Sequence, residues 1–183
     1  MKRMMPVVII LLALSASAFA QTPDPAIEKA LLAAPAQAKN AATVIKWKSD
    51  FTYDTLRKGT NRLVCYERPV APGTTQPFSV ECTSIANLER VAQSLKTETI
   101  KDPKERQAAF EALEKAAKWT KPEFGSIFYN LTGADQATAR SHATIAVPGA
   151  TTATLGLPES GAQGGAWIMN PGTSAAHIMM PGH

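Results

Sequence analysis

Two cysteines, Cys65 and Cys82, constrain the fold of this chain of 183 residues more than any other feature. Both lie in short segments rich in Val, Phe and Tyr, a composition typical of β-strands. In an oxidising compartment two cysteines most simply form one disulfide bond. A metal site or a reactive pair would more typically contain a close Cys-x-x-Cys motif, which this sequence lacks. The sequence therefore predicts a structural disulfide, with a stabilisation of about 3 kcal/mol.

The first twenty residues indicate the compartment. Lys2 and Arg3 precede an apolar run, residues 7–14, and small residues follow up to Ala20. This order is typical of a secretory signal peptide, residues 1–20, that is cleaved after Ala20. The apolar run is too short to cross a hydrocarbon core of about 30 Å, and no other stretch approaches the roughly 20 residues needed. We therefore expect a periplasmic or secreted protein with no transmembrane segment after cleavage.

The sequence after the signal predicts one domain. Residues 21–41 form an N-terminal arm or short helix in this interpretation, and residues 42–183 form the domain. Removal of Lys2 and Arg3 lowers the formal net charge from +4 to +2, and no run of Lys and Arg interleaved with aromatic residues remains. We therefore expect no nucleic-acid partner and a single domain with a modest core.

Local patterns place helices in the arm and in the middle of the domain. Asp24 followed by Pro25 predicts a helix start, and the helix extends over residues 25–34. Asp102, Pro103 and a glutamate three residues after the aspartate form a capping-box pattern at the start of another helix. The buried stripes predicted for the two central helices are Ile85, Leu88, Ala92 and Leu95, and then Phe110, Leu113, Ala116 and Ala117. The predicted solvated face of the later helix consists of Lys104, Glu111, Glu114, Lys115 and Lys118.

Segments rich in β-branched and aromatic residues flank the two central helices on both sides. Residues 148–165 are rich in Gly, Pro, Thr and Ala and predict a long surface loop. Strands, then two helices, then strands predict an α+β fold with a mainly antiparallel sheet, two central helices and the Cys65–Cys82 disulfide. The predicted strands are residues 42–48, 51–57, 63–67, 78–82, 126–131, 142–147, 166–169 and 176–180.

Two segments together resemble a known group of sequences. Residues 56–61 read Leu-Arg-Lys-Gly-Thr-Asn ahead of Cys65, and residues 164–179 contain Gly-Gly-Ala-Trp-Ile-Met, then Pro-Gly-Thr, then Ala-His-Ile-Met. This pattern resembles an uncharacterised family of small secreted bacterial proteins over about residues 42–181. Asn170 and Ala175 depart from it, because the family more often has aromatic residues there. The resemblance implies a secreted single domain and supplies no activity.

The last two predicted strands carry the candidate metal ligands. If these strands pair as a hairpin, alternation places two thioethers and an imidazole on one face. Soft sulfur and nitrogen ligands suit copper in an exported protein. Methionines also fill cores, and half-buried histidines commonly bond to backbone, so the pattern favours a core face with no cofactor. The residues on this face are Met169, His177 and Met179, together with Trp167.

Candidate ligand-binding residues are few. Arg57 and Arg62 flank a predicted turn and suit an anion or an envelope polymer, although exposed arginines beside turns are ordinary. His142, Trp167 and His177 complete the candidate set.

A catalytic site has less support. A set of Ser141 or Ser174, His142 or His177, and Asp135 contains the residue types of a hydrolase triad. The sequence has no Gly-x-Ser-x-Gly elbow and no His-Glu-x-x-His motif, so we predict no catalytic residue. The sequence favours a non-catalytic exported protein that binds an unidentified envelope or extracellular partner. A copper-binding protein and a small extracytoplasmic hydrolase are the alternatives.

Overall fold

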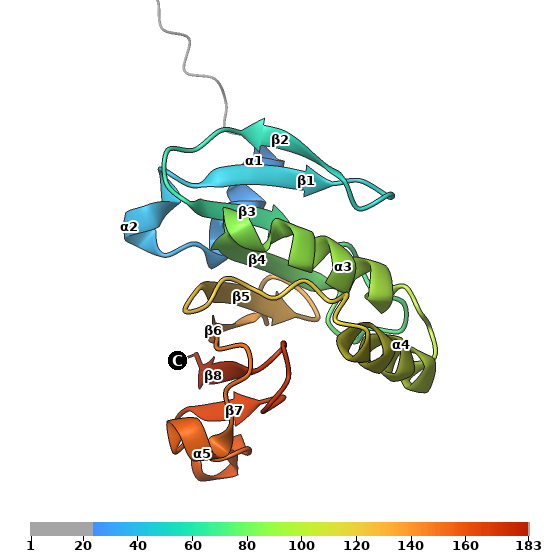
Figure 1. Ribbon diagram of the computed structural model, residues 1–183. Helices are drawn as coiled ribbons and strands as arrows, with labels where there is room; N and C mark the ends of the chain where they lie inside the picture. Colours follow the sequence, from blue (N-terminus) through green and yellow to red (C-terminus); the bar gives the residue numbers. More distant parts are fainter. Residues whose placement is uncertain (1–23, 183) are drawn as a thin grey trace, which may run out of the picture.

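The computed structural model describes residues 24–182, so the predicted signal peptide lies outside the described residues. One eight-stranded sheet runs through the fold, with strand order β2-β1-β3-β4-β5-β6-β8-β7 (Figure 1). Its strands are β1 Thr43–Trp47, β2 Tyr53–Arg57, β3 Leu63–Glu67, β4 Phe78–Ser84, β5 Ile127–Gly133, β6 Arg140–Ala146, β7 Trp167–Met169 and β8 His177–Pro181.

The strand pairing confirms the α+β class and refines the predicted sheet. β1 and β3 pair in parallel, and every other neighbouring pair is antiparallel, so the sheet is mixed. The sheet, rather than two central helices, forms the middle of the fold, with α3 on one face and α1 on the other (Figure 1). The helices are α1 Pro25–Ala30, α2 Ala36–Lys39, α3 Leu88–Glu98, α4 Pro103–Lys115 and α5 Thr152–Leu155, with 3-10 turns η1 Leu31–Ala33, η2 Ile85–Asn87 and η3 Gly161–Gln163.

Both predicted aspartate caps are present. The Asp24 carboxylate accepts a hydrogen bond from the backbone N–H of Ala26, and the Asp102 carboxylate accepts from those of Lys104 and Glu105. A side-chain acceptor at this position satisfies N–H groups that have no partner inside the helix. The start of α4 at Pro103 therefore follows from local sequence alone.

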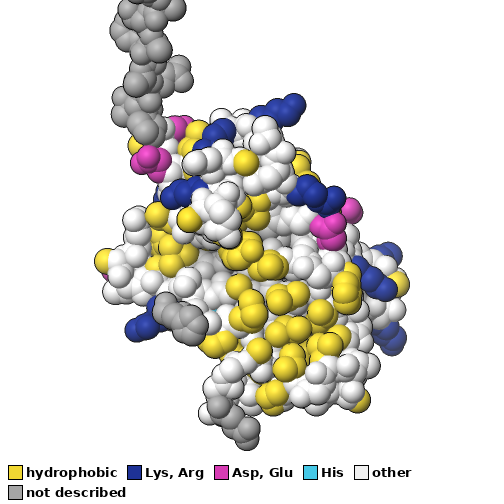
Figure 2. Space-filling model, turned by 90° about the vertical axis from the view of Figure 1, so that its left-hand side faces the viewer, with side chains coloured by type: hydrophobic (Ala, Val, Ile, Leu, Met, Phe, Trp, Pro, Cys, Tyr) yellow, Lys and Arg dark blue, Asp and Glu magenta, His cyan; other side chains and the backbone are white. Residues whose placement is uncertain are grey.

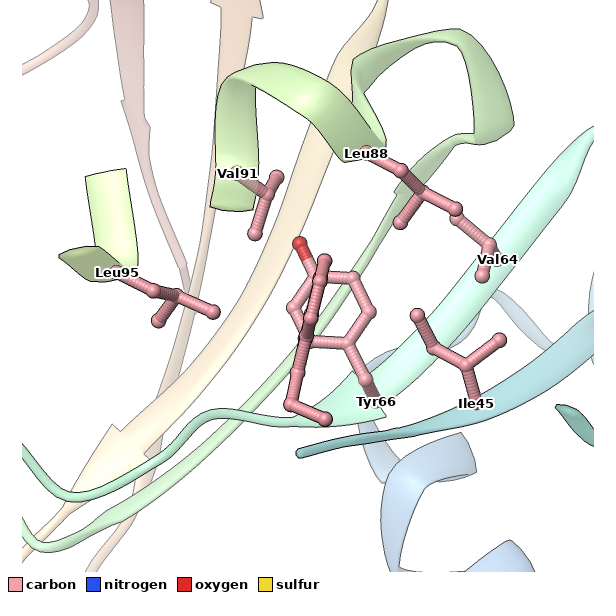
Figure 3. Packing of buried hydrophobic residues seen from close by; sticks show 7 residues of the cluster. Ile45, Val64, Tyr66, Leu88, Val91 and Leu95 are labelled. Atoms are coloured by element: carbon pink, nitrogen blue, oxygen red, sulfur yellow. The ribbon is translucent and has the colours of Figure 1, made fainter. Parts of the chain in front are cut away.

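Helix α3 packs against one face of the sheet. Leu88, Val91 and Leu95 point from α3 toward Tyr66 and its neighbours on β1 and β3 (Figure 3). The predicted stripe was wrong at its first member, because Ile85 lies in η2, before α3, and is 48% exposed. The 3-10 turn has a different periodicity, which rotates Ile85 away from the buried side.

The opposite face holds the disulfide. Cys65 and Cys82 lie directly opposite each other on β3 and β4, with their Cα atoms 4.1 Å apart, and form the predicted bond. Both are fully buried in a cluster that α1 and η1 complete through Ala30 and Leu31. The predicted N-terminal helix is therefore docked on the domain and covers the disulfide.

Helix α4 departs from its predicted burial. None of its residues is fully buried, and Ala116 and Ala117 are exposed just beyond its end. Phe110 is half-buried and packs edge-on against Trp119, with ring centroids 5.1 Å apart. Glu114, which we expected on a solvated face, instead accepts hydrogen bonds from the backbone and hydroxyl of Ser174. Helix α4 is thus attached to the sheet at its margins and leaves space beneath it.

The Arg-Lys-Gly-Thr-Asn segment has a structural role. The Arg57 guanidinium donates to the carbonyls of Lys39 and Ala42, and the Asn61 side chain donates to the carbonyl of Ala38. The backbone N–H groups of Thr60 and Asn61 both donate to the carbonyl of Ala41. These bonds satisfy carbonyls of residues 38–42, where α2 ends and β1 begins. These hydrogen bonds explain why an arginine is present at position 57 and an asparagine at position 61, and the explanation requires no ligand.

Gly59 is expected to tolerate no side chain. A Cβ atom at this position would lie 2.3 Å from the Ala41 carbonyl oxygen and 2.4 Å from the Ala42 carbonyl carbon. Because backbone atoms cannot move aside cheaply, we expect Gly59→Ala to lower the free energy of unfolding by about 2–3 kcal/mol in urea denaturation. The exposed neighbour Lys58 supplies the control, since Lys58→Ala should change stability by less than about 0.5 kcal/mol. Equal stability of the two variants would contradict the close backbone contact.

Candidate functional site

A cavity of about 440 Å³ lies between α3, α4 and the strands β4, β5, β6 and β8. Its volume is within the range of small-molecule sites. The apolar part of its wall includes Val91, Phe110, Trp119, Phe128 and Ala146. The charged and titratable side chains in its wall are Arg68, Glu81, Arg90, Glu98, Arg106 and His177.

Part of the cavity wall is an ion-pair network. Arg68 donates to a Glu81 carboxylate oxygen at 3.0 Å and to both Glu98 oxygens at 2.7 and 2.8 Å. The Tyr66 hydroxyl donates to the other Glu81 oxygen. Burial, together with the Glu81 charge, raises the pKa of Tyr66 well above its ordinary value, so the phenol stays protonated. The carboxylates of Glu81 and Glu98 therefore share one cationic partner, Arg68.

Another part of the cavity wall contains Arg90. Its side chain comes from α3, the residue is 8% exposed, and its guanidinium carbon lies over the Trp119 ring, 4.4 Å from the ring centroid. Nη1 donates to the Thr120 carbonyl at 2.9 Å and to the Ser174 hydroxyl at 3.4 Å. Arg90 forms no ion pair with any residue that the structure describes. Its bonded acceptors are neutral groups.

Burial changes the pKa of Arg90. Desolvation lowers the pKa of its guanidinium to about 10, and the Glu114 charge opposes this only in part. Glu114 reaches Arg90 indirectly, because both bond to the Ser174 hydroxyl. Arg90 thus remains charged at neutral pH, in surroundings that do not fully compensate its charge.

The charged groups of the cavity wall are unequal in number. Arg68, Arg90 and Arg106 carry three positive charges, while Glu81 and Glu98 carry two negative charges. Arg106 lies on α4 and is half-buried. The Arg68 network, with one arginine and two carboxylates, carries a net negative charge, so the positive charge of the wall lies at Arg90 and Arg106.

The C-terminal hairpin has the predicted register. Trp167 pairs with Met179 and Met169 pairs with His177, so these four side chains share one face of β7 and β8. Met169 is 37% exposed and the other three are half-buried, whereas Ile168 on the opposite face is fully buried. The face with the methionines is therefore open in part to solvent.

The sequence-predicted ligand residues lie in different parts of the structure. His142 on β6 lies on the same face as Trp167 and His177, since Thr144, two residues along, pairs with Met179. Burial lowers the pKa of His142, which keeps its ring neutral near pH 7. Arg57 is held by backbone carbonyls at the start of β1. Arg62 forms an exposed ion pair with Glu123, whose carboxylate also accepts from the Ser84 hydroxyl.

The candidate hydrolase residues are dispersed. Ser141 and His142 are successive residues of β6 and therefore lie on opposite faces of the sheet. The Ser174 hydroxyl donates to Glu114 rather than to an imidazole. The Asp135 carboxylate accepts from the backbone and hydroxyl of Thr138 within the turn between β5 and β6. These residues do not form a triad.

Among the sequence-predicted ligand residues, His177 lines the cavity, but sequence reasoning missed Arg68, Arg90 and Trp119. Arg90, Ser94 and Thr97 recur at helical spacing beside the apolar stripe of α3, and all three line the cavity. A polar stripe beside an apolar stripe on one helix could have indicated from the sequence that α3 borders a polar site. Arg68 and Trp119 gave no such signal, because they lie in loops that only the tertiary fold brings to the site.

The other sheet face is apolar over the C-terminal strands. By register, Leu131, Ile145, Ile178 and Met180 lie on the face opposite to His142 and Met179. Helix α1 and turn η1 contact β3, β4 and β5 on that side. Figure 2 shows hydrophobic side chains gathered on the lower half of the molecular face that it presents.

No protein-family model, curated protein sequence or solved structure matches this chain. Among residues 24–182, the structure contains no helix that is both long and apolar enough to span a bilayer.

Proposed function

We propose that the protein is an exported, non-catalytic binding domain that holds a small organic anion in the cavity between α3, α4 and the sheet. Export to the periplasm or the medium rests on the signal-like residues 1–20, and the disulfide between Cys65 and Cys82 is in keeping with an oxidising compartment. The ligand or partner would then be a component of the cell envelope or of the extracellular medium. The mature protein is expected to begin at Gln21, which N-terminal sequencing of the exported form checks.

The observation that carries this proposal is the Arg90 guanidinium in the cavity wall. A buried cation is costly unless a counter-charge accompanies it, and the direct hydrogen-bond partners of Arg90 are neutral. A bound carboxylate would supply the missing charge through charge-assisted hydrogen bonds. The contact between the guanidinium and the Trp119 ring helps to position Arg90, and a guanidinium matches the planar geometry of a carboxylate.

The rest of the wall defines the body of the ligand. Phe110, Trp119 and Phe128 provide aromatic surface around the cavity, together with Val91. Such walls bind an apolar group, while a few polar side chains fix its orientation. The cavity thus suits an aromatic or short-chain carboxylate better than a sugar or a polyanion.

Calorimetric titration with phenylacetate and octanoate tests the proposal, with phenylacetamide and octanamide as uncharged counterparts. We expect at least one carboxylate to bind and its amide to bind more weakly. Arg90→Met should weaken carboxylate binding by about 10- to 100-fold, because a hydrogen bond to a charged group is lost. Arg62→Met removes an exposed arginine outside the cavity and should leave the affinity unchanged. Equal binding of acid and amide, or equal loss in both variants, would contradict the proposal.

A further inference from the structure

We propose that the open face of the β7–β8 hairpin binds one soft monovalent metal ion, Cu(I), through the thioethers of Met169 and Met179 and the imidazole of His177. His177 also lines the cavity, but neither methionine does, so variants of the two methionines test this inference separately from the cavity ligand.

The strand register brings the three side chains together. Met169 and His177 are directly opposite on β7 and β8, which places their Cβ atoms about 4.5–5.5 Å apart. Met179 follows His177 by two residues on the same face and lies diagonally across from Met169, about 7–8 Å away. Methionine has three rotatable side-chain bonds, so both sulfur atoms can reach a common point above the imidazole.

The hydrogen bonding of His177 prepares it as a ligand. Its Nδ1 lies 2.8 Å from the carbonyl oxygen of Ala175, which can only accept, so Nδ1 carries the proton. In the neutral ring Nε2 then keeps its lone pair. A backbone carbonyl that fixes the tautomer and orientation of the ring is the usual outer partner of a metal-binding histidine.

The donor set selects the metal. Two thioethers and one imidazole favour Cu(I), whereas carboxylate and water oxygens favour Mg²⁺ or Ca²⁺. No group of three or more His, Cys, Asp or Glu side chains within residues 24–182 is arranged to hold a metal ion. The exposure of Met169 also gives an ion a path from solvent to the site.

Methionine methyl NMR of the full chain, titrated with Ag(I) as a redox-stable probe for Cu(I), tests this site. The chain has six methionines, and Met180 provides an internal control because it lies beside Met179 on the opposite face. We expect one equivalent of Ag(I) to shift the methyl signals of Met169 and Met179 and the ring signals of His177, and to leave Met180 unchanged.

Matched variants separate a site from nonspecific binding to thioethers. Met169→Leu/Met179→Leu should abolish stoichiometric Ag(I) binding, His177→Gln should weaken it, and Met180→Leu should retain it. Thermal unfolding of each variant checks that the fold is kept. Unchanged Met169 and Met179 signals at several equivalents, or equal loss in Met180→Leu, would overturn the proposal. Carboxylate binding in the cavity should persist in the double leucine variant, so either proposal can fail without the other.

Discussion

Replacing Cys65 and Cys82 together with alanine is expected to lower the free energy of unfolding by about 3 kcal/mol, and the midpoint of thermal unfolding by roughly 6–12 °C. The bond joins directly opposed residues of β3 and β4, at the middle of the sheet. Its loss frees the loop between these strands in the unfolded chain, which raises the conformational entropy of that state. It also leaves small voids in the buried cluster beneath α1 and η1.

Reduction of the wild-type protein supplies the control for this prediction. Reduced wild type keeps both sulfur atoms and loses only the covalent link. If the link is responsible, reduced wild type and the double alanine variant should unfold at similar urea concentrations, both well below the oxidised protein. A double variant that unfolds at the same urea concentration as oxidised wild type would show that the disulfide contributes nothing to stability.

Arg68→Met is expected to lower the free energy of unfolding by about 3–5 kcal/mol, a larger effect than that expected for Gly59→Ala. The substitution leaves the Glu81 carboxylate, which is 5% exposed, without its cationic partner. Uncompensated burial of a charge is far more costly than loss of an exposed pair. The Tyr66 hydroxyl, still bonded to Glu81, cannot replace the lost positive charge.

Two further variants identify the cause. Arg68→Met/Glu81→Gln also removes the unpaired charge of Glu81, while the new amide oxygen still accepts a hydrogen bond from Tyr66. We therefore expect the double variant to recover about half of the free energy of unfolding that Arg68→Met loses. Lys29→Met breaks an exposed pair with Glu67, the last residue of β3 and the neighbour of Arg68, and should cost less than about 1 kcal/mol. Urea unfolding measures all three variants. A double variant less stable than Arg68→Met would contradict the role of the unpaired carboxylate.

The elements that local sequence encodes were predicted well. The bounds 63–67 match β3, because aromatic and β-branched residues there are followed by a loop rich in proline. The start of α4 at Pro103 was set by Asp102 and the proline itself. The β7–β8 register followed from strict alternation over a short hairpin, and so placed Met169 and His177 correctly on one face.

The cavity was not predictable in this way. Its wall combines Arg68 from the loop after β3, Arg90 from α3 and Trp119 from the segment after α4. These residues meet only because β4 pairs with β5 and because α4 stays attached through Glu114 and Ser174. Such contacts are nonlocal, and the only periodic signal for the cavity wall noted in the sequence is the polar stripe of α3 that contains Arg90. The hydrogen-bond partners of Arg57 and Asn61 are likewise distant in the sequence, since they are carbonyls of residues 38–42.

The indole N–H signals of the three tryptophans provide the most direct measurement of the central claim. Trp119 lines the cavity, Trp47 lies in the core beneath α3, and Trp167 lies on β7. Titration with phenylacetate, followed by two-dimensional ¹⁵N–¹H NMR, should shift the Trp119 signal saturably and leave the other two in place, and Arg90→Met should abolish the shift. A saturable shift confined to Trp47 or Trp167, or none with phenylacetate and octanoate alike, would contradict the assignment of this cavity as the ligand site.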